Sequence, residues 1–149
     1  MTVESSRSFE FSAPRERVWA FIADPENRAK AISAVESFTS HDTEDDRTTW
    51  RVRLGLPAFD RTIAVETTDV VRDPPTYVKF VGRSRILSMT GEHELTTTDD
   101  GCRLDTRFTV DGRLPGVERV FERRLDEELS NIRRAAIEFL ETDTNGELT

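Results

Sequence analysis

The sequence predicts an α+β domain in which an antiparallel sheet packs one apolar face against a long C-terminal helix. From Gly116 to Glu141, apolar residues recur every three or four positions, which is the spacing of a single stripe along an α-helix. Between Val35 and Val110, short segments alternate apolar and polar residues, which is typical of strands buried on one face only. Because a stripe of this length needs a partner surface of similar length, we expect the sheet to supply it.

The N-terminal part predicts one strand followed by two short helices. From Val3 to Phe11 the apolar residues share one parity, so this segment is a half-buried strand. Pro14 is suited to the first turn of a helix, and an apolar group follows it. Asp24 can cap a second short helix with Pro25 in its first turn, and this helix is expected over Arg28–Ile32.

A run of antiparallel strands comes next. The predicted strands are Val35–Ser40, Trp50–Leu56, Phe59–Val71, Tyr77–Val81, Ile86–Thr98 and Leu104–Val110. Arg72–Pro75 is a firm turn, and Asp99–Gly101 is a strong hairpin signal. In the strand Ile86–Thr98, the residues on one face are Leu87, Met89, Gly91, His93 and Leu95. The apolar residues of Tyr77–Val81 are nearly continuous, so its two faces cannot be assigned from the pattern.

The charge of the chain excludes some partners. The formal net charge is -8 and the isoelectric point is near 4.9, whereas binding to a nucleic-acid backbone needs a basic face. Lys30 and Lys79 are the only lysines, and Asp and Thr are abundant. This composition is typical of proteins adapted to concentrated salt, in which a high net charge is screened. We therefore predict a halophilic protein that does not bind nucleic acid.

The remaining composition predicts one cytoplasmic domain without covalent cross-links. Cys102 is the only cysteine, so no disulfide forms. The N-terminus has no apolar run as long as that of a signal peptide, and no segment approaches 18 apolar residues. Stable membrane insertion is therefore not expected. The sequence predicts a single domain over residues 1–141. Residues 142–149 lack the apolar stripe, and we expect them to form a disordered tail.

No catalytic or metal-binding motif is present, so we predict no catalytic residues, no metal and no cofactor. His41 and His93 are the only histidines. His41 lies in a charged turn, whereas His93 shares a strand face with apolar residues and could contact a ligand or transfer a proton. A buried neutral histidine with a backbone partner is the plainer interpretation. Arg83 and Arg85 could lie at a cavity mouth, although arginines of this kind more often serve solubility.

Large apolar side chains give the stronger functional signal. The candidate ligand-binding residues, all expected between sheet and helix, are Trp50, Phe59, Phe80, Met89, Gly91, His93, Phe108, Phe121 and Leu125. Core packing explains each of them singly, but together they are more than one helix contact requires and could line a pocket. Gly91 is costly in the middle of a strand unless something approaches it closely or the sheet bends there. We interpret it as open space beside His93.

Several motifs resemble those of the START-like (SRPBCC) superfamily, in its branch of polyketide cyclases and proteins like an accessory subunit of carbon monoxide dehydrogenase. They are the segment Pro14–Pro25, the hairpin Asp100–Leu104, the segment Asp111–Gly116 and the terminal helix. The resemblance runs from about Val3 to Glu141. It implies a helix-grip fold, in which a seven-stranded antiparallel sheet curves around the long helix and two short helices follow the first strand. It also implies a cavity between sheet and helix, which in such proteins holds apolar small molecules or lipids.

The resulting hypothesis is a protein that binds an apolar small molecule or lipid-like ligand between the sheet and the C-terminal helix. One alternative is an enzyme of the polyketide cyclase or aromatase type, in which catalysis is mainly orientation of a reactive chain. Another is an accessory protein of a redox enzyme, as the resemblance to the carbon monoxide dehydrogenase component implies. The sequence favours a binding protein over an enzyme. It does not indicate the ligand, the partner proteins or the oligomeric state.

Overall fold

The structure, a computed structural model, describes residues 2–31, 35–40, 47–53, 62–112 and 117–147. Within these ranges, one strand, two short helices, six further strands and one long helix follow one another in the order expected from the sequence. The strands are β1 (Thr2–Phe11), β2 (Val35–Ser40), β3 (Arg47–Arg53), β4 (Thr62–Asp73), β5 (Tyr77–Arg83), β6 (Leu87–Thr97) and β7 (Cys102–Gly112). The helices are α1 (Arg15–Ile22), α2 (Pro25–Ala31) and α3 (Val117–Glu147).

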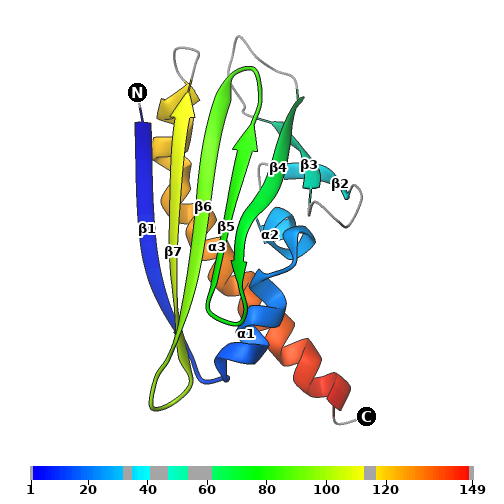
Figure 1. Ribbon diagram of the computed structural model, residues 1–149, viewed down its shortest axis with the longest axis vertical. Coiled ribbons are helices and arrows are strands. Elements are labelled where there is room, and N and C mark those ends of the chain that lie inside the picture. Colours follow the sequence, from blue (N-terminus) through cyan, green and yellow to red (C-terminus); the bar gives the residue numbers. More distant parts are fainter. Residues whose placement is uncertain (1, 32–34, 41–46, 54–61, 113–116, 148–149) are drawn as a thin grey trace.

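The described strands form a seven-stranded sheet with the order β1-β7-β6-β5-β4-β3-β2. Strands β2 to β7 each lie beside their neighbours in the chain, and β7 ends beside β1. Helix α3 runs along the inner face of the sheet, α1 lies toward its lower end, and α2 lies higher and contacts β2 (Figure 1). The predicted class, α+β with an antiparallel sheet and a long C-terminal helix, is therefore confirmed.

Alternating burial shows that only one face of the central strands is covered. In β6 the buried residues are Leu87, Met89, Gly91, His93 and Leu95, as the shared parity predicted. In β5, where the sequence left the faces open, Val78, Phe80 and Gly82 are buried and the residues between them are partly exposed. Polar side chains on the opposite face keep this side of the sheet in contact with water.

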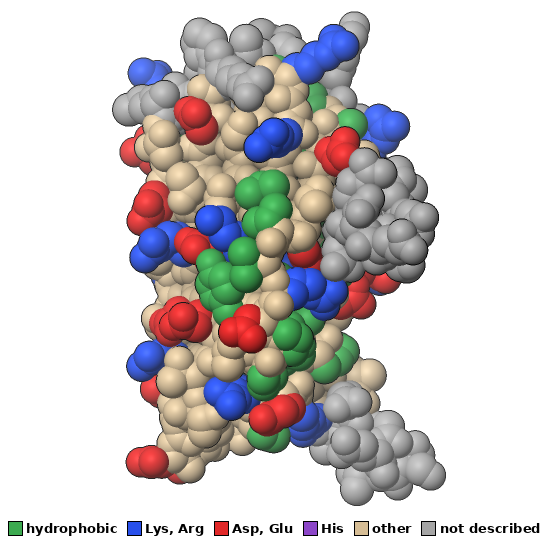
Figure 2. Space-filling model, in the orientation of Figure 1, with side chains coloured by type: hydrophobic (Ala, Val, Ile, Leu, Met, Phe, Trp, Pro, Cys, Tyr) green, Lys and Arg blue, Asp and Glu red, His purple; other side chains and the backbone are tan. Residues whose placement is uncertain are grey.

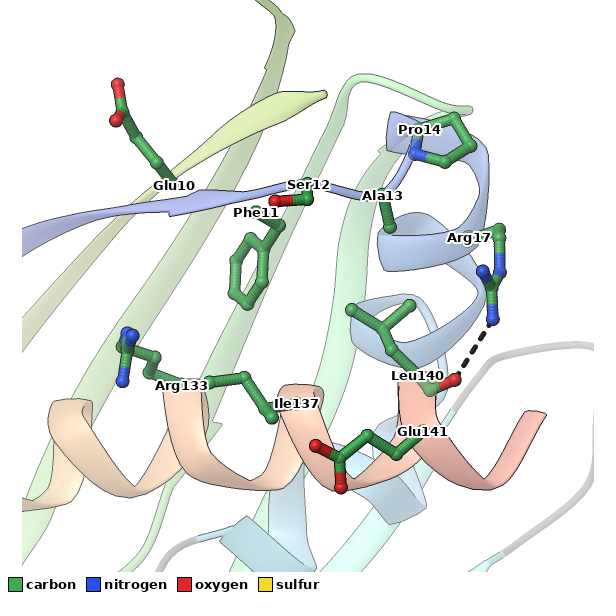
Figure 3. A pocket seen from close by; sticks show the side chains of 10 residues that line it. All are labelled: Glu10, Phe11, Ser12, Ala13, Pro14, Arg17, Arg133, Ile137, Leu140 and Glu141. Carbon is green, nitrogen blue, oxygen red and sulfur yellow. Dashed lines mark hydrogen bonds between the residues drawn. The ribbon is translucent and has the colours of Figure 1, made fainter. Parts of the chain in front are cut away.

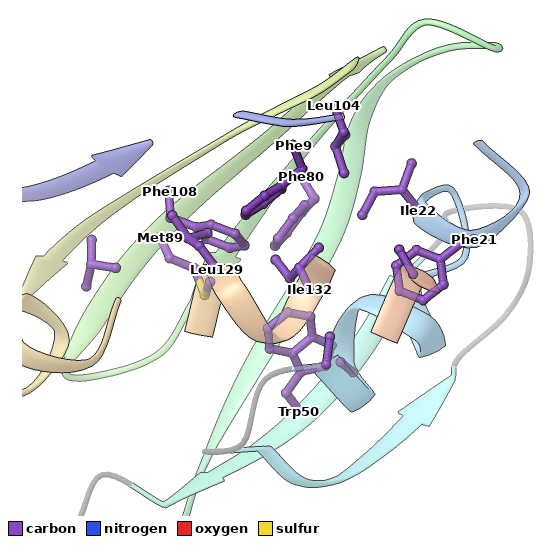
Figure 4. Close-up of a cluster of buried hydrophobic side chains, with 14 of the residues drawn as sticks. Phe9, Phe21, Ile22, Trp50, Phe80, Met89, Leu104, Phe108, Leu129 and Ile132 are labelled. Carbon is purple, nitrogen blue, oxygen red and sulfur yellow. The ribbon is translucent and has the colours of Figure 1, made fainter. Parts of the chain in front are cut away.

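The core lies between the inner face of the sheet, α1 and α3 (Figure 4). Phe9, Phe80 and Phe108 project from the sheet, and Leu129 and Ile132 from α3 meet them, each at most 7% exposed. Burying such side chains contributes roughly 1.5–3 kcal/mol each. Around Leu129 and Ile132, the apolar stripe of α3 therefore packs against the sheet.

Helix α2 begins as predicted. The backbone N–H of Glu26 donates to Oδ1 of Asp24 at 2.9 Å, which is the bond that an N-cap aspartate makes to the second helical residue. Pro25 occupies the first helical position, where its missing N–H costs nothing. This capping fixes the start of α2, and Arg28, one turn later, faces the interior.

The expected disordered tail is wrong for residues 142–147, because α3 continues to Glu147. The apolar stripe ends near Leu140, but the backbone bonds of a helix do not depend on that stripe. No proline interrupts Thr142–Glu147, so the helix extends past α1 beyond the sheet (Figure 1). The domain boundary at residue 141 remains a prediction.

Strand β4 contains an irregularity that places two charged residues on one side of the sheet. Its register with β5 shifts between Asp69 and Val71. Before the shift, Asp69 shares the inward parity of Val65; after it, Arg72 pairs with Val78, an inward-facing residue of β5. One added residue in a strand reverses the faces of everything that follows. The irregularity therefore places Asp69 and Arg72 on the same side of the sheet.

Candidate ligand site

An aromatic cluster surrounds Phe80 on the inner face of the sheet. Its ring centroid lies 5.8 Å from Trp50, 5.8 Å from Phe108 and 6.0 Å from the imidazole of His93. His93 also meets Phe108 edge-on at 5.8 Å. These residues come from β3, β5, β6 and β7, and none of their side chains is more than 2% exposed. Separations of this size are typical of favourable aromatic pairs.

Gly91 is explained by this cluster. Phe80 lies directly opposite Gly91 in the ladder between β5 and β6, and a Cβ built on Gly91 would overlap Cε1 and Cζ of the Phe80 ring. The expected open space above Gly91 is therefore wrong, because the Phe80 ring fills it. Met89 lies over Gly82 in the same way, with its Cγ 2.6 Å from a Cβ placed there.

A buried ion pair lies beside the cluster. Nη2 of Arg28 donates to Oδ1 of Asp69 at 2.6 Å, and both side chains are 2% exposed. The Arg28 guanidinium lies over the Phe80 ring, with Cζ 4.7 Å from the centroid, a favourable cation–π distance. Burial lowers the pKa of Arg28, and the neighbouring Asp69 carboxylate opposes this shift. Nε of the partly exposed Arg72 is 3.9 Å from Oδ2 of Asp69.

Several nitrogen atoms around Phe80 have no hydrogen-bond partner within the described part of the chain. They are Nε and Nη1 of Arg28, Nε1 of Trp50 and both ring nitrogens of His93. Leaving a buried polar group unsatisfied costs about 1–3 kcal/mol, and more for a charged group. Three neighbouring residues with this property are unusual for a plain core, in which buried polar groups are normally paired.

His93 is neutral in the folded protein. Burial lowers its pKa to about 3, and the positive charge of Arg28 acts in the same direction. The neutral ring carries one N–H donor and one acceptor nitrogen. His93 can therefore donate one hydrogen bond and accept another, but no carboxylate among the described residues hydrogen-bonds to it and makes it a strong base.

The buried neutral imidazole should make the protein sensitive to mild acid. The unfolded chain binds a proton at His93 near pH 6.5, whereas the folded chain does so only near pH 3. The free energy of unfolding is therefore highest above pH 6.5 and decreases as the pH falls below this value. At about 1.4 kcal/mol per pH unit, the loss between about pH 6.5 and about pH 5 is roughly 2 kcal/mol. His93→Leu should remove it, as measured by urea unfolding at both pH values. An equal acid-induced loss in the variant would contradict a neutral, buried His93.

Comparison with known proteins identifies the family. The profile described as "Polyketide cyclase / dehydrase and lipid transport" matches residues 2–136. The chain belongs to this family. It is thereby a member of the START-like superfamily, as the motifs of the sequence indicated. No curated protein matches the chain.

Solved structures share the fold of this family member at low sequence identity. The Zhui aromatase/cyclase from Streptomyces sp. R1128 superimposes with a TM-score of 0.74 at 14% identity, covering 95% of this chain and 94% of that one. A conserved protein from Geobacillus kaustophilus gives 0.72 at 17% identity, with 95% and 97% covered. The di-domain ARO/CYC StfQ from the steffimycin biosynthetic pathway gives 0.72 at 14% identity, covering 97% of this chain and 52% of StfQ. The chain thus spans about half of StfQ, and these likenesses show the fold alone.

The family member brings most of its predicted site residues together. Trp50, Phe80, Met89, His93 and Phe108 all lie on the inner face of the sheet and are buried. Phe59 lies outside the described residues; Phe121 and Leu125 lie in α3, and their side chains are not among those described. The role of the set as ligand contacts remains a prediction.

Sequence reasoning missed Arg28 and Asp69. Arg28 lies in a short polar helix that gives no periodic signal, and its partner is 41 residues away. A usable signal existed for Asp69, which shares the parity of Ile63 and Val65 and so falls on the apolar face of its strand. The arginines that were considered, Arg83 and Arg85, are exposed.

An open groove of 730 Å³ lies where the end of β1 and the start of α1 meet the C-terminal part of α3 (Figure 3). Phe11, Ile137 and Leu140 provide apolar surface, and Arg17 donates from Nη2 to the carbonyl oxygen of Leu140 at 3.0 Å. Charged side chains, among them Glu10, Arg133 and Glu141, also line the groove. Because Arg17 ties α1 to α3 across this groove, we interpret the groove as a joint between elements.

The outer face of the sheet mixes acidic and basic side chains (Figure 2). Within the described residues, no cluster of His, Cys, Asp and Glu is arranged to hold a metal ion. Among the described helices, none combines the length and apolar character needed to cross a membrane. The unsatisfied nitrogen atoms make the inner cluster around Phe80 the better candidate site.

The hydrogen bond of Tyr77 on the outer face of the sheet can be tested by titrating the tyrosine. Its hydroxyl donates to Oε1 of Glu92 at 2.7 Å, and burial together with this carboxylate raises the pKa of Tyr77 to about 12. Tyr77 is the only tyrosine of the sequence, so phenolate absorbance reports it alone. Glu92→Gln should lower this pKa toward 10, because the amide does not repel the phenolate. An unchanged titration curve would show that Glu92 does not contact the hydroxyl.

Proposed function

We propose that this family member binds an apolar, lipid-like small molecule between the inner face of its sheet and α3. Rings and a flexible thioether line this region, with Trp50, Phe80, Met89 and Phe108 all at most 8% exposed. Such a lining suits an apolar ligand, and a methionine adapts its shape to different ligands. The family description, which includes lipid transport, supports the same class of ligand.

One observation carries the proposal: Arg28, Trp50 and His93 hold buried nitrogen atoms that no described group satisfies. In a core selected for stability alone, apolar side chains of similar size would avoid the free-energy cost of leaving these nitrogen atoms without hydrogen bonds. Binding sites combine an apolar lining with a few well-placed polar groups, which is the pattern around Phe80. A ligand that reaches these nitrogens would supply the missing partners.

An enzyme of the cyclase or aromatase type is the second candidate. It is favoured by the position of the Arg28 charge beside a neutral imidazole, because such a pair can polarise a carbonyl group and hydrogen-bond to it. Zhui, an aromatase/cyclase, and StfQ, a di-domain ARO/CYC, share the fold and belong to the same class. An accessory role beside a redox enzyme remains a prediction from the resemblance only.

Fluorescence titration tests the binding proposal. N-Phenyl-1-naphthylamine is an uncharged apolar probe that becomes bright in a dry environment, and we expect saturable binding that 1-decanol displaces. Native mass spectrometry of freshly purified protein should show a bound small molecule that denaturation releases. If the folded protein binds no probe and carries no molecule, the interior is a plain core and the proposal is wrong.

A further inference from the structure

We propose that Arg28, Trp50 and His93 form an anchor for the carboxylate of an apolar monocarboxylic acid. This inference rests on the proposed function and specifies its ligand. The anchor is defined by these residues, which come from α2, β3 and β6 and meet around Phe80. Their side chains are buried, at 2%, 2% and 1% exposed, so a group bound there is shielded from water.

The hydrogen-bonding inventory of the anchor favours an acceptor-rich group. Arg28 uses Nη2 for Asp69 and keeps N–H groups on Nε and Nη1, while Trp50 offers one N–H on Nε1. Neutral His93 adds one donor and one acceptor. Donors therefore outnumber acceptors. A carboxylate has two oxygens that accept several hydrogen bonds, so it can serve donors from different residues at once.

The local charge favours a single negative charge on the ligand. Arg28 and Arg72 are cationic and both approach the one carboxylate of Asp69, at 2.6 and 3.9 Å. Asp24 also attracts Arg28 electrostatically, but its side chain is exposed to solvent and is screened. His93 contributes no charge because it is neutral. A bound monoanion would pair with the buried charge of Arg28, and buried charges are tolerated when they are paired.

The surroundings of the anchor favour an apolar remainder. The rings of His93, Phe80 and Phe108 pack against one another, and Phe80 also contacts Trp50 and the Arg28 guanidinium. Beyond the anchor, the described inner face continues with Met89 and Leu87, both buried. A small polar anion such as acetate would leave these contacts unused, so we infer a long alkyl or aromatic carboxylic acid.

Displacement of N-phenyl-1-naphthylamine by a matched pair of ligands tests the anchor. Decanoate and 1-decanol share one chain and differ in the head group, and at about pH 8 decanoate is ionised. We expect decanoate to bind about tenfold more tightly, because hydrogen bonds to charged groups are the stronger ones. If decanol displaces the probe and decanoate is no better, the anchor is wrong while the proposed function stands. If neither displaces it, the proposed function itself fails.

The orientation of the bound acid gives a second, independent readout. The sequence has two tryptophans, so Trp19→Phe leaves Trp50 as the only indole. Bromine quenches tryptophan fluorescence only near contact. A carboxylate held at the anchor places 2-bromodecanoate closer to Trp50 than 10-bromodecanoate, so the 2-bromo acid should quench more strongly at saturation. Stronger quenching by the 10-bromo acid would place the head group elsewhere and overturn the inference.

Variants then assign the preference to named residues. His93→Leu should reduce the ratio of decanoate to decanol affinity by at least about threefold, without lowering the thermal midpoint. Leu95→Met, on the same face of β6, is the matched control and should leave the ratio unchanged. If the double variant Arg28→Leu/Asp69→Leu folds, it should lose the preference for decanoate over decanol. If it does not fold, the result for His93→Leu decides whether the anchor binds the carboxylate. A preference that survives His93→Leu unchanged, or that Leu95→Met reduces equally, would contradict the anchor.

Discussion

Arg28→Leu should destabilise the protein by about 3–5 kcal/mol, the usual cost of removing one partner of a buried ion pair. The variant leaves Asp69, whose side chain is 2% exposed, without its 2.6 Å contact. Arg72 remains at 3.9 Å from the same carboxylate, but its side chain is 35% exposed and the contact is long. Unfolding in urea, followed by circular dichroism, measures the loss.

A double variant separates the charge from the packing. In Arg28→Leu/Asp69→Leu the buried carboxylate is gone as well, so most of the loss should be recovered, because apolar replacement of a buried pair is often neutral or stabilising. Arg83→Leu is the matched control on an exposed arginine and should change stability by no more than about 0.5 kcal/mol. A single variant that loses less than about 1 kcal/mol would show that Asp69 reaches solvent.

Local periodicity predicted the elements that depend on one repeated contact. The shared parity of Leu87, Met89 and His93 describes residues that meet the same neighbouring layer, and the structure places them there. The same holds for the described part of the α3 stripe, in which Leu129, Ile132 and Ala136 are buried. The cap of Asp24 on α2 involves only adjacent residues, so it was equally visible. In each case, the physical cause lies within a few positions of the chain.

Features that depend on two distant segments could not be predicted in this way. The pair of Arg28 and Asp69 joins a short helix to a strand, and the register shift after Asp69 has no sequence signal that would fix its place. The length of α3 was underestimated because the end of an apolar stripe marks the end of packing, whereas the helix itself continues to Glu147. The unsatisfied nitrogens of the anchor need a known fold before they can be recognised.

Stability and binding should respond in opposite directions at His93. Replacing His93 removes a buried group without partners in the described part of the chain, which favours folding above pH 6.5, yet it also removes a group that a ligand would contact. A substitution at an ordinary core position changes packing and stability without this gain. Such opposed effects are expected where a site retains polar groups at the expense of stability.

Gly91→Leu should destabilise the protein by about 3 kcal/mol, at the upper end of the usual cost of overpacking a core. A Cβ at this position would overlap the Phe80 ring, and that ring is held by contacts to Trp50, His93 and Phe108. The cluster therefore has little freedom to move aside. Thermal unfolding of the variant would measure the loss.

The same-strand control and a compensating change make this prediction specific to Phe80. Thr90→Leu adds a similar side chain to the adjacent, partly exposed position and should cost less than about 1 kcal/mol. Gly91→Ala/Phe80→Leu should be more stable than Gly91→Ala alone, because the smaller side chain makes room for the added methyl group. If Gly91→Leu is as stable as Thr90→Leu, the Phe80 ring does not occupy the space above Gly91, and that space would then belong to the ligand site.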